Sequence, residues 1–444
     1  MSYTTVHLGM DDIDSPRGGC TTHFACILAE KLEQFHVQWL DYPNLIRLNP
    51  NIPFRTRGNG AVALRFVVRS EMIAQILTMT RNMTVNYVER GYPNTNPGLV
   101  VVTGEPPDEL MTLAGRTLWR TVPIALAQRI IQRNSLKHFS MGNGRGLIGS
   151  LSAIGNQLTD DHTYEYLAYR SIDACSQERG VDARSVFDMD KMMGDKLFSN
   201  IDPMTGEVLI APRGPDPVIY GIRGERPYYV TEAAEHVRSV QAKDRWMIMR
   251  TNQGTGEHLT HRVSVCDLRP YMAAVIQGRV VSPPRMIEGG HVIFSVADET
   301  GKIDCAIYEP AGELRENALM LAPNDDVTLH SGVRPAASNH GLTLNVEGFE
   351  VLEMSETVVF SNPVCPQCGK RMTSAGQGKG FKCTACGFKG RDSTKTETSV
   401  TRGLERGLYL PPPRAQRHLT RPKTRTTKRN SGVPTRLMHE WHYP

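Results

Sequence analysis

The sequence contains no long hydrophobic run. No stretch approaches the roughly 20 apolar residues that a membrane-spanning helix needs. The chain also does not open with a basic segment followed by an apolar one, as a secretory signal peptide does. We therefore expect neither a membrane helix nor a signal peptide, and we expect the protein to be cytoplasmic. With 444 residues, 40% of them hydrophobic, the chain is long enough for several domains with cores of their own.

The sequence also lacks a disulfide framework, because its nine cysteines are odd in number and irregularly spaced. Four of them form two C-x2-C pairs, the arrangement that turns two sulfurs toward one tetrahedral ion. Gly369 and Gly387 each follow a pair, where a positive φ would disfavour larger residues. We predict a structural zinc site without an open coordination position. Its ligands are Cys365, Cys368, Cys383 and Cys386.

Acidic residues are absent from Arg414 to Arg436, which holds eight Lys or Arg residues. The simplest interpretation is a flexible, solvated tail. The functional interpretation, which we favour, is electrostatic attachment to RNA, since each neutralised phosphate releases counterions. The candidate RNA-binding residues are Arg414, Arg417, Arg421, Lys423 and Arg425.

The stretch DDIDSPRGGCTTH, residues 11–23, places three carboxylates before a glycine pair and two threonines. It follows an alternating, strand-like segment and precedes a helical pattern, whose first amides can bind an anion. Carboxylates repel a bare phosphate, so the two features fit together if Mg²⁺ lies between them. An ordinary turn with threonine caps is the alternative. The candidates are Asp11, Asp12 and Asp14 for Mg²⁺, and Gly18, Gly19 and Thr22 for ATP phosphates.

Two further glycine-rich stretches, RTRGNGA at 55–61 and GNGRGLIG at 142–149, pair arginine with exposed backbone. Neither matches the Walker pattern, and either stretch could instead be a simple turn. We take them as candidate phosphate-binding loops. The residues concerned are Arg57, Gly58, Gly144, Arg145 and Gly146.

The order of strand-like and helical patterns indicates a multidomain α+β protein. The N-terminal segment reads as α/β layers, and a second α+β unit follows it. From about residue 263 to 354 the chain is all-β, with five strand-like runs and a helical stretch after the third. That order predicts an OB-fold β-barrel, which often binds single-stranded nucleic acid, although a barrel used only for protein contacts is the alternative.

Several of these blocks together resemble the archaeal tRNA(Ile) 2-agmatinylcytidine synthetase family. The resemblance extends over nearly the whole chain. It rests on GMDDIDSPRGGCTTH, LIRLNPNIPFRTRGNGA, NTNPG, GRGLIGSLSAIG, YGIRGE, EGGHVIF, the four-cysteine ribbon and PPPRAQRHL. It implies an ATP-dependent ligase that couples agmatine to C2 of the wobble cytidine in a CAU-anticodon tRNA(Ile), so that AUA is read as isoleucine.

The resemblance also implies domains, cofactors and partners. ATP, Mg²⁺ and Zn²⁺ are the expected cofactors, tRNA(Ile) and agmatine the expected partners, and no obligate protein partner is inferred. By alignment of CTT, Thr21 is the threonine that becomes phosphorylated. The expected domains are a kinase-like ATP-binding catalytic domain (1–132), a ferredoxin-like domain (133–260), the OB-fold (261–355), the zinc ribbon (356–395) and a Pro-rich basic tail (396–444).

Two other functions compete with this one. A non-catalytic single-strand-binding protein would also combine an OB barrel with a zinc ribbon, but it has little use for clustered carboxylates. A small-molecule kinase with RNA-binding appendages would turn over ATP without regard to tRNA.

Overall fold

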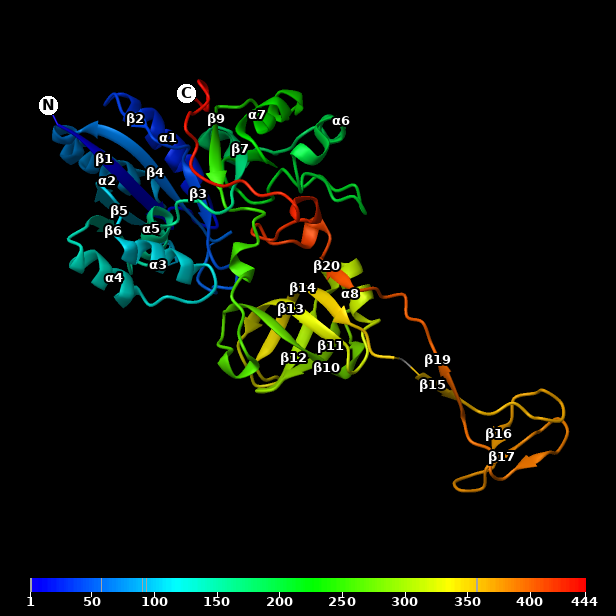
Figure 1. Ribbon diagram of the computed structural model, residues 1–444. Helices are drawn as coiled ribbons and strands as arrows, with labels where there is room; N and C mark the ends of the chain where they lie inside the picture. The colour runs from blue at the N-terminus through cyan, green and yellow to red at the C-terminus, as the bar shows by residue number, and fades with distance from the viewer. Residues whose placement is uncertain (1, 57, 90, 93, 357) are drawn as a thin grey trace.

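The computed structural model describes residues 2–56, 58–89, 91–92, 94–356 and 358–444 (Figure 1). Its largest element is one ten-stranded sheet, to which both predicted N-terminal units contribute. The first unit supplies β1 (Tyr3–Asp11), β2 (Gln38–Trp39), β3 (Asn44–Arg47), β4 (Gly60–Arg69), β5 (Gly98–Thr103) and β6 (Lys137–Ser140). The second supplies β7 (Thr163–Tyr169), β8 (Val218–Gly224) and β9 (Arg245–Thr251), and the chain end supplies β21 (His442–Tyr443).

The strand order is β6-β5-β1-β4-β3-β9-β7-β8, with β2 added to β4 and β21 added to β9. Within this sheet, among the described residues, only the β3–β9 pair is parallel, and this pair joins the two units. The alternation of strands and helices suggested α/β layers, but the sheet is antiparallel elsewhere. The N-terminal fold is therefore α+β, because its strands pair antiparallel.

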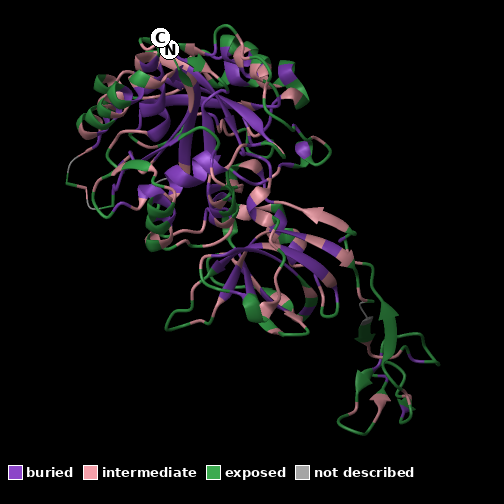
Figure 2. Cartoon of the chain, turned by 60° about the vertical axis from the view of Figure 1, so that its left-hand side comes forward, coloured by how far each residue is buried: buried purple, intermediate pink, exposed green. Residues whose placement is uncertain are grey.

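Helices cover both faces of this sheet, and the strands between them are buried (Figure 2). One face packs against α1 (Thr21–Glu33), α2 (Ile73–Tyr87), α6 (Ala183–Met193) and α7 (Pro227–His236). The other face packs against α3 (Asp108–Thr117), α4 (Ile124–Arg133) and α5 (Gly146–Gly155). The alternation along β1 follows this division, since Val6, Leu8 and Met10 all face the first core.

Helix α5 lies unusually close to the strands, and glycines permit the approach. A Cβ on Gly9 would lie 2.2 Å from the carbonyl oxygen of Ser150, and a Cβ on Gly98 would lie 2.2 Å from the backbone of Gly146. On the helix itself, a Cβ on Gly146 would meet the backbone nitrogen of Gly98 at 2.4 Å. Any larger residue would push α5 away from the ends of β1 and β5.

A five-stranded barrel follows, as the sequence predicts. Its strands are β10 (Ala273–Met286), β11 (Val292–Asp298), β12 (Gly301–Ile307), β13 (Asp326–Arg334) and β14 (Thr343–Glu353), with α8 (Glu313–Ala318) between the third and fourth. Parallel pairing of β12 with β14 closes the barrel, and β20 (Gly407–Tyr409) adds to β14. Its apolar core is separate from those of the sheet.

The four-cysteine segment projects from the barrel on a two-stranded stalk formed by β15 (Val358–Ser361) and β19 (Thr396–Ser399) (Figure 1). At its end a small sheet contains β16 (Thr373–Ser374), β17 (Phe381–Lys382) and β18 (Lys389–Gly390). Most of this arm is exposed (Figure 2). No helix among the described residues is long and apolar enough to cross a bilayer.

The basic C-terminal segment returns from the arm, adds β20 to the barrel, crosses the second unit and ends as β21 in the large sheet (Figure 1). Ion pairs hold it there. Arg425 is 0% exposed; its Nε donates to Glu225 at 2.7 Å, and its Nη2 donates to Asp161 at 3.1 Å. Arg421 also pairs with Asp161, and Arg414 pairs with the buried Asp202 at 2.9 Å.

Arg425→Met should destabilise the fold by about 3 kcal/mol, because it leaves Asp161 and Glu225 without their buried cationic partner. Arg429→Met is the matched control: its side chain is 65% exposed, and its contacts, a hydrogen bond of 2.8 Å to the carbonyl of Asp160 and an ion pair of 3.8 Å with the Asp160 carboxylate, are both exposed to solvent. We expect that variant to change stability by less than about 0.5 kcal/mol. Urea unfolding of the full chain measures both, and equal stability of the two variants would contradict the role of Arg425.

Candidate active site

The three aspartates lie where β1 leaves the sheet. Strand β1 is paired on both sides, with β4 and with β5, up to its last residues. Asp11 ends the strand, and its carboxylate rests against helix α5, where a Cβ on Gly149 would meet its Oδ2 at 2.0 Å. The glycine on α5 therefore makes room for a carboxylate.

Asp12 is fixed by its backbone and by several partners. Its φ of 58° lies in the left-handed region, which aspartate tolerates better than most residues. Its carboxylate accepts a hydrogen bond from the backbone N–H of Asn96 at 3.0 Å and from Thr56 Oγ1 at 3.3 Å, and it lies 3.6 Å from Arg145 Nη2. These contacts hold one side chain in a single orientation between three loops.

Burial raises the pKa of two of these carboxyl groups, and neighbouring negative charge adds to the effect. Burial raises the pKa of Asp12 to about 6, against the opposing effects of Arg145 and Asn96. Burial and then the negative charge of Asp12 raise the pKa of Asp11 well above its ordinary value. Like charges this close favour a proton or a cation between them.

The aspartates do not form a ready-made metal cage. Among the described residues, only the four ribbon cysteines bring three or more metal-binding atoms within 4.8 Å of one another. Mg²⁺ commonly needs only one or two carboxylates, because water and substrate phosphates complete its octahedron. The site therefore suits an ion that arrives with a nucleotide better than one held by protein ligands alone.

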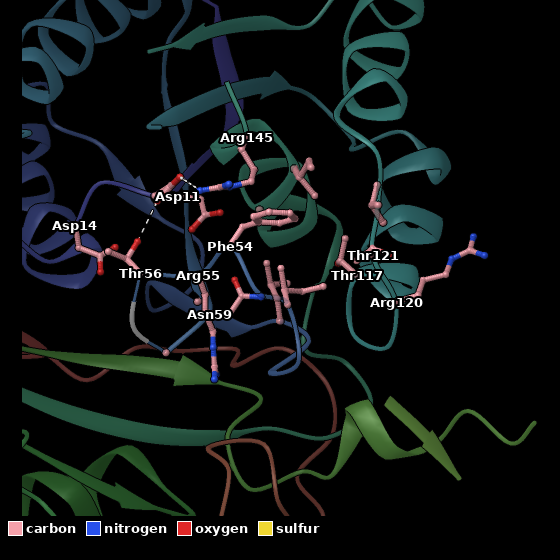
Figure 3. A pocket seen from close by; sticks show the side chains of 18 residues that line it. Asp11, Asp14, Phe54, Arg55, Thr56, Asn59, Thr117, Arg120, Thr121 and Arg145 are labelled. Carbon is pink, nitrogen blue, oxygen red and sulfur yellow. Dashed lines mark hydrogen bonds and ion pairs between the residues drawn. The ribbon is translucent and has the colours of Figure 1, made fainter. Parts of the chain in front are cut away.

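All three aspartates line a cavity between the sheet, the 48–60 loop and the 117–122 loop (Figure 3). Polar residues in the wall are Thr56, Asn59, Thr117 and Thr121. Arg145 points toward the aspartates, whereas Arg55 and Arg120 contribute to the wall but extend their side chains away from them (Figure 3). The apolar part of the wall is Leu48, Ile52, Phe54, Val122 and Ile148. Carboxylates at one end, arginines around the rim and an apolar wall suit a phosphorylated ligand with a flat ring.

A second cavity adjoins the first and shares Asp14, Gly58 and Gly60 with it. Thr21 and Thr22, the first residues of α1, line this second cavity. Thr21 Oγ1 lies 3.5 Å from Asp14 Oδ1, whereas Thr22 Oγ1 lies 3.0 Å from the sulfur of Cys20. Cys20 is the N-cap residue, and no side chain among the described residues caps the helix, so threonine capping does not explain CTT.

The glycines predicted to bind phosphate have different structural roles. Gly19 and Gly144 take positive φ angles of 71° and 74°, and Gly18 closes a turn with Ser15. Gly146 is needed for the close packing of α5, so its presence requires no phosphate. Gly58 lies in the wall between the two cavities, and Arg57 lies outside the described residues.

The four cysteines meet as predicted. Their sulfurs all lie within 4.8 Å of one another, with Cys365 and Cys386 at 3.5 Å and Cys368 and Cys383 at 3.4 Å. Gly369 and Gly387 have φ of 69° and 80°. Four converging thiol sulfurs fit tetrahedral Zn²⁺ and leave no position for a substrate.

The tail arginines do not form a free basic patch. Arg425 is buried and fully paired with Asp161 and Glu225, so its predicted contact with tRNA phosphate is corrected to an intramolecular role. Arg414 and Arg421 are paired with Asp202 and Asp161. Arg417 pairs with Glu347 at 3.8 Å and keeps 40% of its side chain exposed. Lys423 begins a short 3₁₀ helix and stays on the surface.

Sequence reasoning missed the residues that hold Asp12. Thr56 stands inside the RTRGNGA block, which was considered only for its arginine and glycines. Asn96 belongs to NTNPG, a block noted only for its resemblance. Thr56 lies 44 positions and Asn96 lies 84 positions after Asp12 in the sequence. No local sequence pattern indicates that either residue contacts Asp12.

Three family models match the chain. They are described as the TiaS TCKD domain over residues 7–77, the TiaS FLD domain over residues 144–258 and the TiaS C-terminal zinc ribbon domain over residues 362–404.

Curated relatives and solved structures match nearly the whole chain. TiaS of Staphylothermus marinus, a tRNA(Ile) 2-agmatinylcytidine synthetase, is 39% identical, covering 98% of this chain and 97% of that protein. The enzyme of the same name from Thermococcus sibiricus is 37% identical, covering 94% of this chain and 95% of that protein. A crystal structure of TiaS in complex with an isoleucine tRNA and ATP superposes with a TM-score of 0.86 at 35% identity, covering 98% of this chain and all of the other.

A further solved structure is a complex of TiaS with an isoleucine tRNA, AMPCPP and agmatine, with a TM-score of 0.83 at 33% identity over 98% of this chain and 100% of the other. Full-length identity of this size, together with the aspartate loop, the paired cavities and the cysteine quartet, confirms the resemblance. The chain belongs to the tRNA(Ile) 2-agmatinylcytidine synthetase family.

Proposed function

We propose that this chain uses ATP to couple agmatine to C2 of the wobble cytidine in a CAU-anticodon tRNA(Ile). The observation that carries this proposal is the set of three aspartates at the end of β1, in a cavity rimmed by arginines. Family membership supplies the substrates, because relatives of this length and identity carry the synthetase name. Solved relatives that hold tRNA with ATP, or with an ATP analogue and agmatine, support the same assignment.

The chemistry requires activation of a poor leaving group. Two phosphoryl transfers account for the products. In one, the C2 oxygen of cytidine forms a new O–P bond as the bond from that phosphorus to the rest of the nucleotide breaks; the agmatine amine then forms the bond to C2 and loses a proton, and the oxygen leaves as phosphate. In the other, Thr21 Oγ1 accepts a phosphoryl group from the nucleotide and water releases it as the second phosphate, so that ATP ends as AMP and two phosphates. The cytosine must leave the anticodon stack to reach the cavity.

We assign Mg²⁺ to Asp11, Asp12 and Asp14, with phosphate oxygens of ATP completing its coordination. The ion would neutralise the phosphates during transfer. The raised pKa values of Asp11 and Asp12, which burial causes with a smaller contribution from neighbouring carboxylates, fit this assignment, because a bound cation would stabilise the charged form of both groups. Asn96 and Thr56 orient Asp12, and Arg145 brings a positive charge to the same edge of the cavity.

The remaining parts are assigned to RNA binding. The five-stranded barrel has the strand order of an OB fold, a fold that often binds single-stranded nucleic acid across one face. The kinase-like (1–132), ferredoxin-like (133–260), OB (261–355) and ribbon (356–395) assignments fit the elements, although β6 and α5 pack with the first unit beyond residue 132. Of the tail residues, Arg417 and Lys423 remain as surface candidates for tRNA phosphate.

The two competing functions are less well supported. A passive single-strand binder would have no use for clustered carboxylates whose pKa values burial raises in a cavity. A small-molecule kinase would hydrolyse ATP without tRNA, and the assay below separates it from a ligase.

Asp12→Asn should lower modification at least about a thousandfold, equivalent to about 4 kcal/mol of lost transition-state stabilisation. The purified protein is incubated with CAU-anticodon tRNA, Mg-ATP and agmatine, and the anticodon fragment is weighed by mass spectrometry. Affinity for tRNA should stay within about threefold, since the change removes a negative charge. Asp108→Asn, an exposed acid on α3, is the control and should keep full activity. A fully active Asp12 variant would refute the metal-binding role.

Thr21→Ala should abolish transfer of label from γ-labelled ATP to the protein, because the hydroxyl beside Asp14 is removed. Thr21→Ser should restore labelling, and Thr22→Ala should retain it, since its hydroxyl faces the Cys20 sulfur. Peptide mass mapping identifies the modified residue. Label retained in Thr21→Ala would transfer the assignment to another side chain.

Removal of zinc should weaken tRNA binding about tenfold or more while leaving ATP hydrolysis nearly unchanged, because the ribbon lies on a stalk away from the aspartates. A chelator titration followed by filter binding and phosphate release measures both quantities. Cys266→Ser, at an exposed cysteine outside the ribbon, controls for thiol effects. Parallel loss of both activities would show that the ribbon supports the whole fold.

A further inference from the structure

Four arginine side chains from four parts of the chain converge around His418, which makes a cluster of five basic side chains. We call them the His418 cluster. They are Arg47 at the end of β3, Arg55 in the 48–60 loop, Arg223 on β8, and Arg417 and His418 in the C-terminal segment. Arg223 Nη2 donates to His418 Nδ1 at 3.3 Å. Arg47 Nη1 and the His418 ring both lie within 3.2 Å of the place where a Cβ on Gly58 would be.

The carboxylates nearby do not neutralise this cluster. Glu165, on β7, pairs with Arg223 at 3.2 Å and also accepts a hydrogen bond from Gln253. Glu347, on β14 of the barrel, lies 3.8 Å from Arg417 and is closer, at 3.2 Å, to His258. Among the described residues, the four guanidinium groups thus pair with only two carboxylates, each of which serves another partner as well, and Asp14 is a further acid whose charge acts on Arg47.

His418 lines three neighbouring cavities. One is the Thr21 cavity, which also contains Glu165, Asp14 and Asp216. The walls of the other two contain no carboxylate among the described residues, while arginines supply their charge. One of these two also borders Gly58 and Asn59, so it lies on the other side of the loop that lines the aspartate cavity. His418 itself remains accessible to solvent, so a ligand can reach it.

Both the electrostatics and the hydrogen bonding of the His418 cluster favour a bound anion. The charge of Arg47 is the largest of the effects that hold the pKa of His418 well below its ordinary value, with desolvation, Arg223, Arg55 and Arg417 adding to it. Desolvation and the charge of Arg223 also lower the pKa of Arg47. The buried Nε–H of Arg47 has no hydrogen-bond partner in the described part of the chain.

We propose that the His418 cluster is a phosphate-binding site, separate from the aspartate cavity and reached from the opposite side of the Gly58 loop. Guanidinium groups recognise phosphate oxygens by charge-assisted hydrogen bonds. A neutral imidazole that accepts from Arg223 at Nδ1 carries its proton on Nε2, and so has one more donor to offer. The inference rests on the proposed function only for the source of the phosphate, which is either ATP or the tRNA backbone.

Nuclear magnetic resonance of the histidine side chains tests the site without any turnover. The full chain is labelled at the histidine ring carbon, and the His418→Gln variant identifies the His418 signal. Inorganic phosphate should raise the pKa of His418, because a bound anion offsets the arginine charges that favour the neutral ring. No change in the His418 titration at saturating phosphate would overturn the proposal.

Variants locate the binding. Arg55→Gln combined with Arg417→Gln should weaken phosphate binding about tenfold, since two charge-assisted contacts are lost. Both side chains are exposed, so the fold should tolerate the change. Arg429→Gln, an exposed arginine of the same C-terminal segment, is the control and should bind phosphate as the unchanged chain does. Equal binding by the double variant and the control would also overturn the proposal.

Competition then identifies the source of the phosphate. Displacement of inorganic phosphate by ATP alone assigns the cluster to the nucleotide, and displacement by tRNA alone assigns it to the RNA backbone. Asp12→Asn should leave the inorganic phosphate effect on His418 intact. Loss of modification with an intact His418 response therefore separates failure of the catalytic proposal from failure of this one.

Discussion

The close approach of α5 to the ends of β1 and β5 is the constraint on which the active site depends. Helix and strands meet backbone to backbone, because Gly98 and Gly146 have no side chains where they touch. The approach sets Arg145, just before the helix, beside Asp12, and places Gly149 against the carboxylate of Asp11. A methyl group at any of these glycines would separate the arginine from the aspartates before it affected any ligand.

The large sheet gives this arrangement its rigidity. Parallel pairing of β3 with β9 joins two units that the sequence separates, and the buried Arg250 on β9 pairs with Asp41 across the same junction at 2.5 Å. The Thr21 cavity is lined by residues from both units, and it shares Asp14 and Gly58 with the aspartate cavity. A site built between strands of one continuous sheet keeps its groups in register better than a site between two freely moving domains.

The features that the sequence predicted are those in which the spacing itself carries the chemistry. The cysteine quartet and its positive-φ glycines could be inferred from two C-x2-C pairs, and the acidic loop could be inferred from its place between a strand and a helix. The barrel followed from five strand-like runs and the position of one helix. Each signal is contained within a short stretch of chain.

The features that escaped prediction depend on contacts between distant residues. The eight basic residues of the tail indicated RNA, but Arg425 meets Asp161 and Glu225, more than 190 positions earlier. Net charge cannot distinguish a free cation from one whose partners lie elsewhere in the chain. For the same reason Gly146 looked like a phosphate-binding residue, although its partner is the backbone of Gly98.

The barrel is held directly by the loops that line the aspartate cavity. Asn49 Nδ2 donates to the carbonyl of Tyr271 at 2.8 Å, and the backbone N–H of Ala273 donates to the carbonyl of Trp119 at 2.7 Å. Trp119 also stacks on His261 at 3.6 Å, directly before Arg120 and Thr121 of the cavity wall. The barrel is therefore hydrogen-bonded to both loops that line the aspartate cavity. An RNA bound to the barrel would be connected to the catalytic residues through these contacts. The same 48–60 loop borders the His418 cluster on its other side, which places a basic site, the barrel and the aspartates around one short segment of chain.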